Sequence, residues 1–94
     1  YTNPQLTLWT EQLFGLYVGT SVKHSKCGYA CSDHASWNRF GFPSVFPFET
    51  PFENYNRRIH TPNDIWDAQL DDAFASQFSK LAIAYALELG ELAE

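Results

Sequence analysis

Apolar residues recur at helical spacing in a stretch near the start of the chain. They fall three or four positions apart and so share one face of a helix: Leu6, Trp9, Leu13 and Leu16. Asn3 is a favoured N-cap residue, and Pro4 suits the first helical position, where its missing N–H is not needed. The pattern therefore predicts an amphipathic helix over residues 4–18, ended by Gly19.

A second helical pattern lies near the other end of the chain. Its apolar residues form a continuous stripe: Phe74, Phe78, Leu81, Tyr85 and Leu89. Asp71 and Asp72 suit the positive N-terminal end of a helix, and Gly90 is a common residue at its end. We expect a long helix over residues 71–89.

Shorter elements are predicted between these helices. Residues 20–24 contain β-branched side chains in rough alternation, and residues 42–48 form a short apolar run with prolines, so each predicts a short strand. Ser32 is a suitable cap for a short helix over residues 33–40. Residues 50–60 predict a long irregular loop, and ordered loops of this length are usually functional.

Alternation of helices and strands is typical of an α/β fold, with helices covering a sheet. Two strands are too few for a stable sheet, and the helices present more apolar surface than two strands can cover. The sequence also opens at Tyr1, as a processed or excised segment does. We therefore expect a segment of a larger α/β domain, whose uncovered helix faces favour association with a second copy.

Composition narrows the classes of partner. With 94 residues, 45% hydrophobic and 17% aromatic, the chain is suited to a packed core rather than disorder. The net charge of −5 argues against a nucleic-acid partner, because Arg57 and Arg58 form the only local basic pair and are best interpreted as a solvated loop. The longest apolar stretch, residues 81–87, is too short to span a bilayer, so no membrane association is expected.

The two cysteines, Cys27 and Cys31, are separated by only three residues. They could form a short-loop disulfide, contribute to a metal site or remain free thiols. This spacing alone is weak evidence for zinc, whereas Gly28 permits the bend that a short disulfide loop requires. We favour the disulfide, which predicts an oxidising, extracellular compartment and hence a secreted protein.

Four interpretations compete for the chemistry of residues 27–60. A cysteine or serine could act as a nucleophile with His34 as its base, or His34 or His60 could bind a metal. Trp37, Tyr29 and Tyr55 could stack on a carbohydrate. The aromatic residues could also simply form a packed wall with no chemistry. The residue types and spacings leave these four possibilities open.

Longer motifs in the same stretch resemble a known family. The run CGYACSDHASW, followed by PFE, FENYN and RIHT, resembles the C-terminal part of the M28 family of zinc aminopeptidases, and is most similar to the secreted bacterial leucyl aminopeptidases of the Vibrio type. The run LAIAYALELG also looks like the final helix of those enzymes. The resemblance implies that residues 1–94 are the C-terminal portion of a single catalytic domain. That domain would have three layers, α/β/α, with a mixed central sheet and helices on both faces.

The resemblance also implies an activity. Enzymes of this type release hydrophobic N-terminal residues such as leucine from peptides, using water activated by two zinc ions. His60 matches the last histidine ligand of the family, and the neighbouring Asn56, Arg58 and Thr61 are expected to hold its ring. The other ligands and the general-base glutamate would lie upstream of Tyr1. The segment would then contain no catalytic base and would be inactive alone.

The family's substrate pocket is better represented in this segment. By resemblance, it is lined by the cysteine loop and the aromatic segments that follow it: Cys27, Tyr29, Cys31, Phe46, Phe48, Phe52, Tyr55 and Ile59. These side chains would form an apolar cup for a leucine-sized side chain, whose burial contributes about 1.5–3 kcal/mol. The Tyr29 hydroxyl is expected to donate a hydrogen bond to the tetrahedral intermediate. The alternative is a non-catalytic binding or self-associating module.

Overall fold

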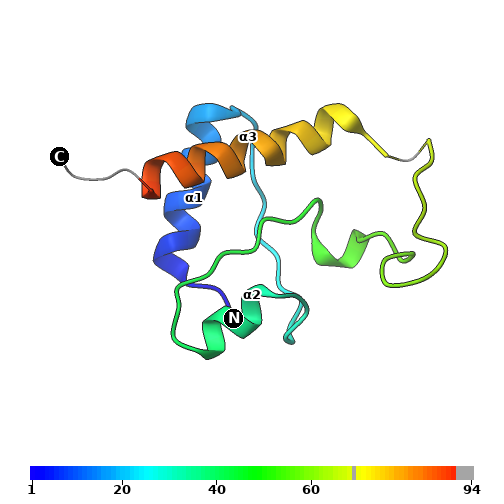
Figure 1. The fold of residues 1–94 in the computed structure, drawn as a ribbon, viewed down its shortest axis with the longest axis horizontal. Helices are drawn as coiled ribbons and strands as arrows, with labels where there is room; N and C mark the ends of the chain where they lie inside the picture. Colours follow the sequence, from blue (N-terminus) through cyan, green and yellow to red (C-terminus); the bar gives the residue numbers. More distant parts are fainter. Residues whose placement is uncertain (69, 91–94) are drawn as a thin grey trace.

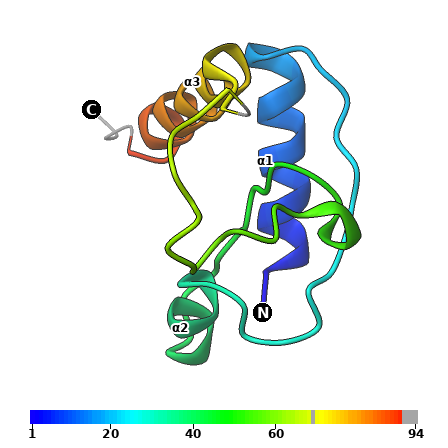
Figure 2. The same ribbon diagram turned by 90° about the vertical axis from the view of Figure 1, so that its right-hand side faces the viewer.

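The fold consists of helices joined by long irregular segments (Figures 1 and 2). A computed structural model describes residues 1–68 and 70–90. The predicted C-terminal portion of a catalytic domain, residues 1–94, thus includes residues 69 and 91–94, which lie outside the described residues. The elements are α1 (Pro4–Tyr17), α2 (His34–Arg39), the 3₁₀ turn η1 (Phe52–Asn54) and α3 (Asp72–Leu89).

The first helix, α1, begins where its capping residues predict. The Asn3 side-chain Oδ1 accepts a hydrogen bond of 2.8 Å from the Leu6 amide, and Pro4 is the first helical residue. This bond satisfies one of the amides that a helix start leaves without an intrahelical partner. The helix ends at Tyr17, and Gly19 then turns the chain with a φ of 86°. The predicted N-terminal helix is confirmed.

The last helix, α3, is confirmed in the same way. The Asp71 carboxylate accepts a hydrogen bond of 3.0 Å from the Phe74 amide, which makes Asp71 the N-cap rather than the first helical residue. The helix ends at Leu89, and the Gly90 amide donates to the Ala86 carbonyl over 2.8 Å. The acidic start therefore acts as its chemistry predicts. Gly90 has an ordinary φ of −86°, and a Cβ there would lie 2.6 Å from the Ala86 carbonyl oxygen, so a close approach favours glycine.

Helix α3 crosses the C-terminal half of α1, and this crossing holds the buried core (Figures 1 and 2). Leu13, Leu81 and Ala84 are its buried members, and three larger side chains pack against them: Trp9, Phe14 and Tyr85. The rings of Trp9 and Tyr85 meet edge to face with centroids 5.6 Å apart. At the rim of the core, the Tyr17 hydroxyl donates a 2.7 Å hydrogen bond to the Glu88 carboxylate, which raises the pKa of Tyr17.

The short helix α2 begins one residue later than predicted. Its N-cap is Asp33, without a side-chain capping bond, and Ser32 contributes only its carbonyl, to the Ala35 amide at 3.1 Å. The prediction that Ser32 caps the helix is therefore wrong. The helix ends at Arg39, and Gly41 follows with a φ of 87°.

The expectation of an α/β fold is wrong for the part of the chain that the structure describes. Residues 1–68 and 70–90 contain no strand, so neither the two predicted strands nor a three-layer arrangement with a mixed central sheet is present. Residues 20–24 and 42–48 run as irregular segments instead. A strand is stable only when its amides and carbonyls pair with a neighbouring strand. Pro43 and Pro47 also remove two donors from the second segment.

Few apolar side chains are buried. Among the described residues, the buried apolar ones are Leu13, Ala35, Leu81 and Ala84. Much larger side chains are left at the surface, with exposed fractions of 69–82%: Leu16, Phe40, Trp66 and Leu87. No described helix is long and apolar enough to cross a membrane. Much of the apolar area of the described chain is therefore exposed at the surface rather than buried in the small core.

Candidate functional site

A small cavity brings together the residues that the resemblance assigned to a substrate pocket. It has a volume of about 110 Å³ and is lined by Tyr29, Cys31, Phe46, Phe48, Phe52, Tyr55, Arg57, Ile59 and His60. We call this cavity the cup. All of the predicted lining residues except Cys27 contribute to it, and so does the predicted metal ligand, His60. Arg57 is the additional member.

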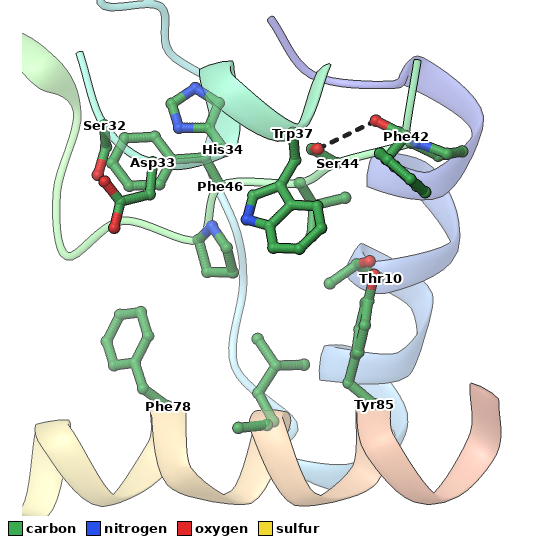
Figure 3. Close-up of a pocket in the computed structure, with 15 residues that line it drawn as sticks. Thr10, Ser32, Asp33, His34, Trp37, Phe42, Ser44, Phe46, Phe78 and Tyr85 are labelled. Atoms are coloured by element: carbon green, nitrogen blue, oxygen red, sulfur yellow. Dashed lines mark hydrogen bonds between the residues drawn. The ribbon is translucent and has the colours of Figure 1, made fainter. Parts of the chain in front are cut away.

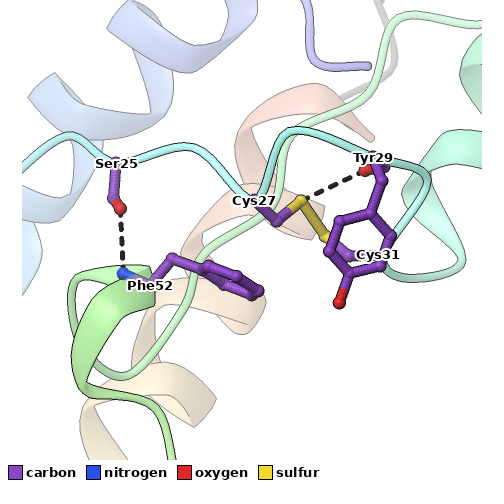
Figure 4. Close-up of a disulfide and its surroundings, with 5 residues drawn as sticks. All are labelled: Ser25, Cys27, Tyr29, Cys31 and Phe52. Atoms are coloured by element: carbon purple, nitrogen blue, oxygen red, sulfur yellow. Dashed lines mark hydrogen bonds between the residues drawn. A yellow bond between two sulfur atoms is a disulfide. The ribbon is translucent and has the colours of Figure 1, made fainter.

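The disulfide loop forms one side of the cup. Cys27 and Cys31 are joined by a disulfide, as the sequence favoured, and Gly28 between them has a φ of 78° (Figure 4). The bridge also excludes a free cysteine nucleophile or thiolate ligand at these positions. The Ser25 hydroxyl oxygen accepts a 2.8 Å hydrogen bond from the Phe52 amide (Figure 4). This bond ties the segment before the disulfide to the start of η1.

The floor of the cup is a row of aromatic rings. The centroid distances along the row are 5.3 Å from Phe46 to Phe48, 6.4 Å from Phe48 to Phe52, and 4.9 Å from Phe52 to Tyr55. Tyr29 from the disulfide loop meets Phe52 edge to face at 6.0 Å. Phe52 thus contacts three rings and is the centre of the row. Each such pair contributes about 0.5–1.5 kcal/mol beyond the area that it buries.

The turn η1 explains why two of these rings stack. It follows Pro51, and the Asn54 amide donates to the Pro51 carbonyl at 2.9 Å, while the Tyr55 amide donates to Phe52 at 3.3 Å. Residues three apart lie one above the other in a 3₁₀ turn. Phe52 and Tyr55 therefore point to the same side of the chain and into the cup.

His60 lies at the rim of the cup in an unusual backbone conformation. Its φ is 62°, and it is the one non-glycine residue with a positive φ in the described part of the chain. Histidine tolerates this region better than most residues, and held conformations of this kind cluster at functional sites. The side chain of His60 is exposed, so its imidazole is accessible at the edge of the cavity.

The neighbours of His60 brace the backbone of this turn. The Asn56 side-chain oxygen accepts a 2.9 Å hydrogen bond from the Arg58 amide, and the Arg58 carbonyl accepts one of 3.1 Å from the Thr61 amide. The Arg58 guanidinium also forms a 2.8 Å ion pair with Asp67, which raises the pKa of Arg58. The sequence predicted that three residues hold the imidazole ring of His60: Asn56, Arg58 and Thr61. The hydrogen bonds above instead hold the backbone on either side of His60.

The described residues do not form a metal site by themselves. Within residues 1–68 and 70–90, no three or more histidine, cysteine or acidic side chains are grouped so that they could hold an ion. A catalytic zinc site needs three protein ligands. His60 lines the cup, whereas His24 is not among the lining residues and is paired with Glu11 at 2.9 Å.

A larger groove lies on the other side of Phe46, between α2 and α3 (Figure 3). Its volume is about 650 Å³, and its walls include Thr10, Trp37, Phe42, Phe78 and Tyr85. The His34 ring stacks on Phe46 with centroids 4.3 Å apart and planes within 12°. Its Nδ1 atom is buried without a hydrogen-bond partner in the described structure, and burial lowers the pKa of the imidazole. His34 therefore supports the ring row from behind rather than entering the cup.

Arg57 is the lining residue that the sequence interpretation missed. Its guanidinium carbon lies 4.0 Å from the centroid of the Tyr55 ring. The signal in the sequence was an arginine two positions after an aromatic residue, because the face of an aromatic ring attracts a cation. The Arg57 Nη2 atom also donates a 3.2 Å hydrogen bond to the Glu53 carbonyl, which helps to hold the guanidinium in this place. The basic pair is therefore not simply solvated, since Arg57 contacts the cup and Arg58 is paired with Asp67.

Comparison with known proteins identifies the family. The profile of Peptidase family M28 matches residues 2–86. A protein named probable leucine aminopeptidase from Arthroderma benhamiae is 41% identical over 88 residues, which cover 94% of this chain and 24% of that protein. Leucine aminopeptidase 1 from Penicillium rubens is 40% identical, over 95% of this chain and 23% of that protein. The chain therefore spans about a quarter of the length of these relatives.

Solved structures contain the same fold. The crystal structure of the LapA aminopeptidase of Legionella pneumophila matches all of this chain and 25% of its own, with a TM-score of 0.92 and 44% identity. LapB from the same organism matches 98% of this chain and 25% of its own, with a TM-score of 0.89 and 40% identity. The helices and irregular connections described above thus recur within these larger proteins. On the sequence match, supported by this structural agreement, the chain belongs to peptidase family M28.

Proposed function

We propose that this chain is the C-terminal portion of the catalytic domain of a secreted aminopeptidase that removes hydrophobic residues, such as leucine, from the N-terminus of peptides. The observation that carries the proposal is the cup, in which an apolar ring row, a disulfide loop and an accessible imidazole meet. The relatives named leucine aminopeptidases support the reaction class.

The size of the cup supports a single apolar side chain as its occupant. Its volume of about 110 Å³ is somewhat smaller than the roughly 150 Å³ engineered cavity that binds benzene. A leucine side chain has no polar atom to satisfy, and its burial against the rings contributes about 1.5–3 kcal/mol. The N-terminal residue of the substrate would insert its side chain here and leave the first peptide bond at the rim.

His60 lies at that rim and would supply one zinc ligand. The remaining ligands for two zinc ions and the general base would come from the portion of the protein that corresponds to the unmatched three quarters of the relatives. When bound, the zinc ions would supply an activated water beside the carbonyl of the first peptide bond. The side chain of Tyr29 is exposed beside Phe52, and its hydroxyl would donate a hydrogen bond to the developing oxyanion.

The surface of the chain supports a role as part of a larger domain. The groove beside α2 and exposed residues such as Leu16 and Leu87 offer apolar area that the rest of the domain would cover. The 94-residue chain alone would be inactive, since it supplies one ligand and no general base. In isolation its uncovered helix faces would favour association between copies.

Secretion is proposed from the disulfide. Short-loop disulfides such as Cys27–Cys31 form and persist in oxidising compartments. The test is to locate the protein in cell and medium fractions of its host and to assay its thiols by mass spectrometry with and without reductant. Protein confined to the cell interior with two free thiols would contradict the proposal.

The activity is tested by comparing the full-length protein with residues 1–94 on two substrates. Leucine p-nitroanilide has a free amino group, and N-acetyl-leucine p-nitroanilide differs only in the blocked amine. We expect hydrolysis of the first substrate alone, and by the full-length protein alone. Equal hydrolysis of both substrates would refute an exopeptidase, and zinc-loaded full-length protein inactive on every aminoacyl anilide would favour a non-catalytic binding module.

A further inference from the structure

Arg57 is held against the last ring of the aromatic row. One face of Tyr55 stacks on Phe52, with centroids 4.9 Å apart and planes within 28°, and the Arg57 guanidinium covers Tyr55 at 4.0 Å. The Arg57 Nη2 atom also donates a 3.2 Å hydrogen bond to the Glu53 carbonyl. A cation over a tyrosine face is attracted by the negative face of the ring. These two contacts keep a permanent positive charge at the edge of the cup.

Among the described residues, no acidic side chain in the lining of the cup balances this charge. The described lining residues include no aspartate or glutamate, and neither Glu49 nor Glu53 is among them. Arginine remains protonated throughout the range in which proteins are stable. A second cation placed in the cup would therefore meet a like charge without a compensating carboxylate, in a site where apolar walls exclude part of the screening water.

We propose that Arg57 determines specificity by rejecting substrates whose N-terminal residue has a cationic side chain, such as lysine or arginine. This inference rests on the proposed function, in which the cup receives the N-terminal side chain. The four-carbon stem of lysine suits the ring row as well as an alkyl side chain does. Its ammonium group, however, would lie in the same small cavity as the guanidinium.

Two substrates with the same stem isolate the effect of the charge. Norleucine and lysine p-nitroanilides both carry a four-carbon side chain, and lysine adds only the ammonium group. In full-length wild-type protein we expect kcat/KM to be higher for norleucine. In Arg57→Gln, which keeps a hydrogen-bond donor on a shorter side chain but removes the charge, this preference should fall about three- to tenfold, as expected for like charges in a partly solvated site. Arg57→Glu should lower it further.

Two further variants make the test decisive. Arg57→Lys keeps the positive charge and should keep the preference for norleucine, and an Arg57→Lys protein that accepts lysine as readily as Arg57→Gln does would overturn the proposal. Arg39→Gln removes the same charge from the exposed end of α2, outside the cup, and should leave the preference unchanged. The effect of Arg57→Gln should also shrink at high salt, because added ions screen the interaction.

Failure of this inference is distinguishable from failure of the proposed function. The second readout is the leucine-to-alanine preference of Phe52→Ala, which reports whether the cup receives the side chain. If Phe52→Ala lowers that preference but Arg57→Gln leaves the norleucine-to-lysine ratio at the wild-type value, the role of Arg57 is refuted and the cup stands. If neither variant changes its ratio, the cup is not the side-chain site, and both proposals fail.

Discussion

Phe52 offers the sharpest test of the cup because it joins the three parts of its wall. Its ring contacts Tyr29 from the disulfide loop, Phe48 from the irregular segment of residues 42–48, and Tyr55 directly after η1. Its amide donates a hydrogen bond to the Ser25 hydroxyl oxygen, so its backbone is held independently of the ring. Phe52→Ala should therefore open the cup while leaving the main chain in place.

The size of the effect follows from the area that the ring covers. A leucine side chain has three carbons more than alanine, and at about 0.8 kcal/mol per buried carbon a closed cup prefers leucine by about 2.4 kcal/mol, or roughly 60-fold. Phe52 is the central ring of the row, so its removal should expose about half of that surface. The loss of about 1.2 kcal/mol corresponds to a fall of roughly eightfold in the leucine-to-alanine preference.

The assay compares kcat/KM for leucine and alanine p-nitroanilides in full-length wild-type and Phe52→Ala proteins, below the unfolding temperature of both. Phe42→Ala is the matched control, because Phe42 also belongs to an aromatic pair, with Trp37 at 5.6 Å, but lines the groove and not the cup. We expect its preference to equal that of the wild type. An unchanged preference in Phe52→Ala, or an equal fall in Phe42→Ala, would refute the reasoning.

Three further outcomes are expected for full-length protein. Tyr29→Phe should lower kcat at least tenfold with little change in KM, since the lost hydroxyl would act on the transition state, and steady-state kinetics showing only a higher KM would contradict that role. Leu81→Ala should lower the free energy of unfolding in urea by about 2–5 kcal/mol, because Leu81 is 5% exposed in the α1–α3 core, whereas a loss below about 1 kcal/mol would contradict its placement. Burial lowers the pKa of His34 below its ordinary 6.5, so the unfolded chain binds more protons there and stability should fall as the pH drops through this value. The fall in the free energy of unfolding should be smaller in His34→Phe, as measured by urea unfolding above and below this pH. An equal fall in both proteins would refute the role of His34.

The helices were predictable because their signals are local. The bond from the Leu6 amide to Asn3 and the bond from the Phe74 amide to Asp71 each join residues three apart, so capping chemistry alone locates both helix starts. The strands were not predictable in this way. An apolar run such as residues 42–48 becomes a strand only if another segment pairs with it. The Ser44 carbonyl accepts a 2.8 Å hydrogen bond from the Asn3 amide at the start of α1, but residues 1–68 and 70–90 contain no strand that could pair with this run.

Most of the residues that line the cup were named from the sequence, but the geometry of the cavity was not. The resemblance supplied the lining residues and His60, while the ring row depends on contacts across long stretches of chain, such as Tyr29 with Phe52. Arg57 was missed because a basic pair is usually solvated, and the sequence does not reveal the contacts of its guanidinium with the Tyr55 ring and the Glu53 carbonyl. The residues that fix His60 also act through the backbone, which residue types alone do not reveal.

His60 is the residue on which the enzyme interpretation depends most directly. The decisive experiment measures zinc content per molecule and leucine p-nitroanilide hydrolysis in full-length His60→Ala. The control is His24→Ala, because the exposed imidazole of His24 is paired with Glu11 in the described structure. We expect His60→Ala to lose activity by roughly 100-fold or more and to retain less zinc, because even residues that only support a ligand contribute 10–100-fold. His24→Ala should match the wild type in both. Full activity and unchanged zinc content in His60→Ala would contradict its assignment as a metal ligand.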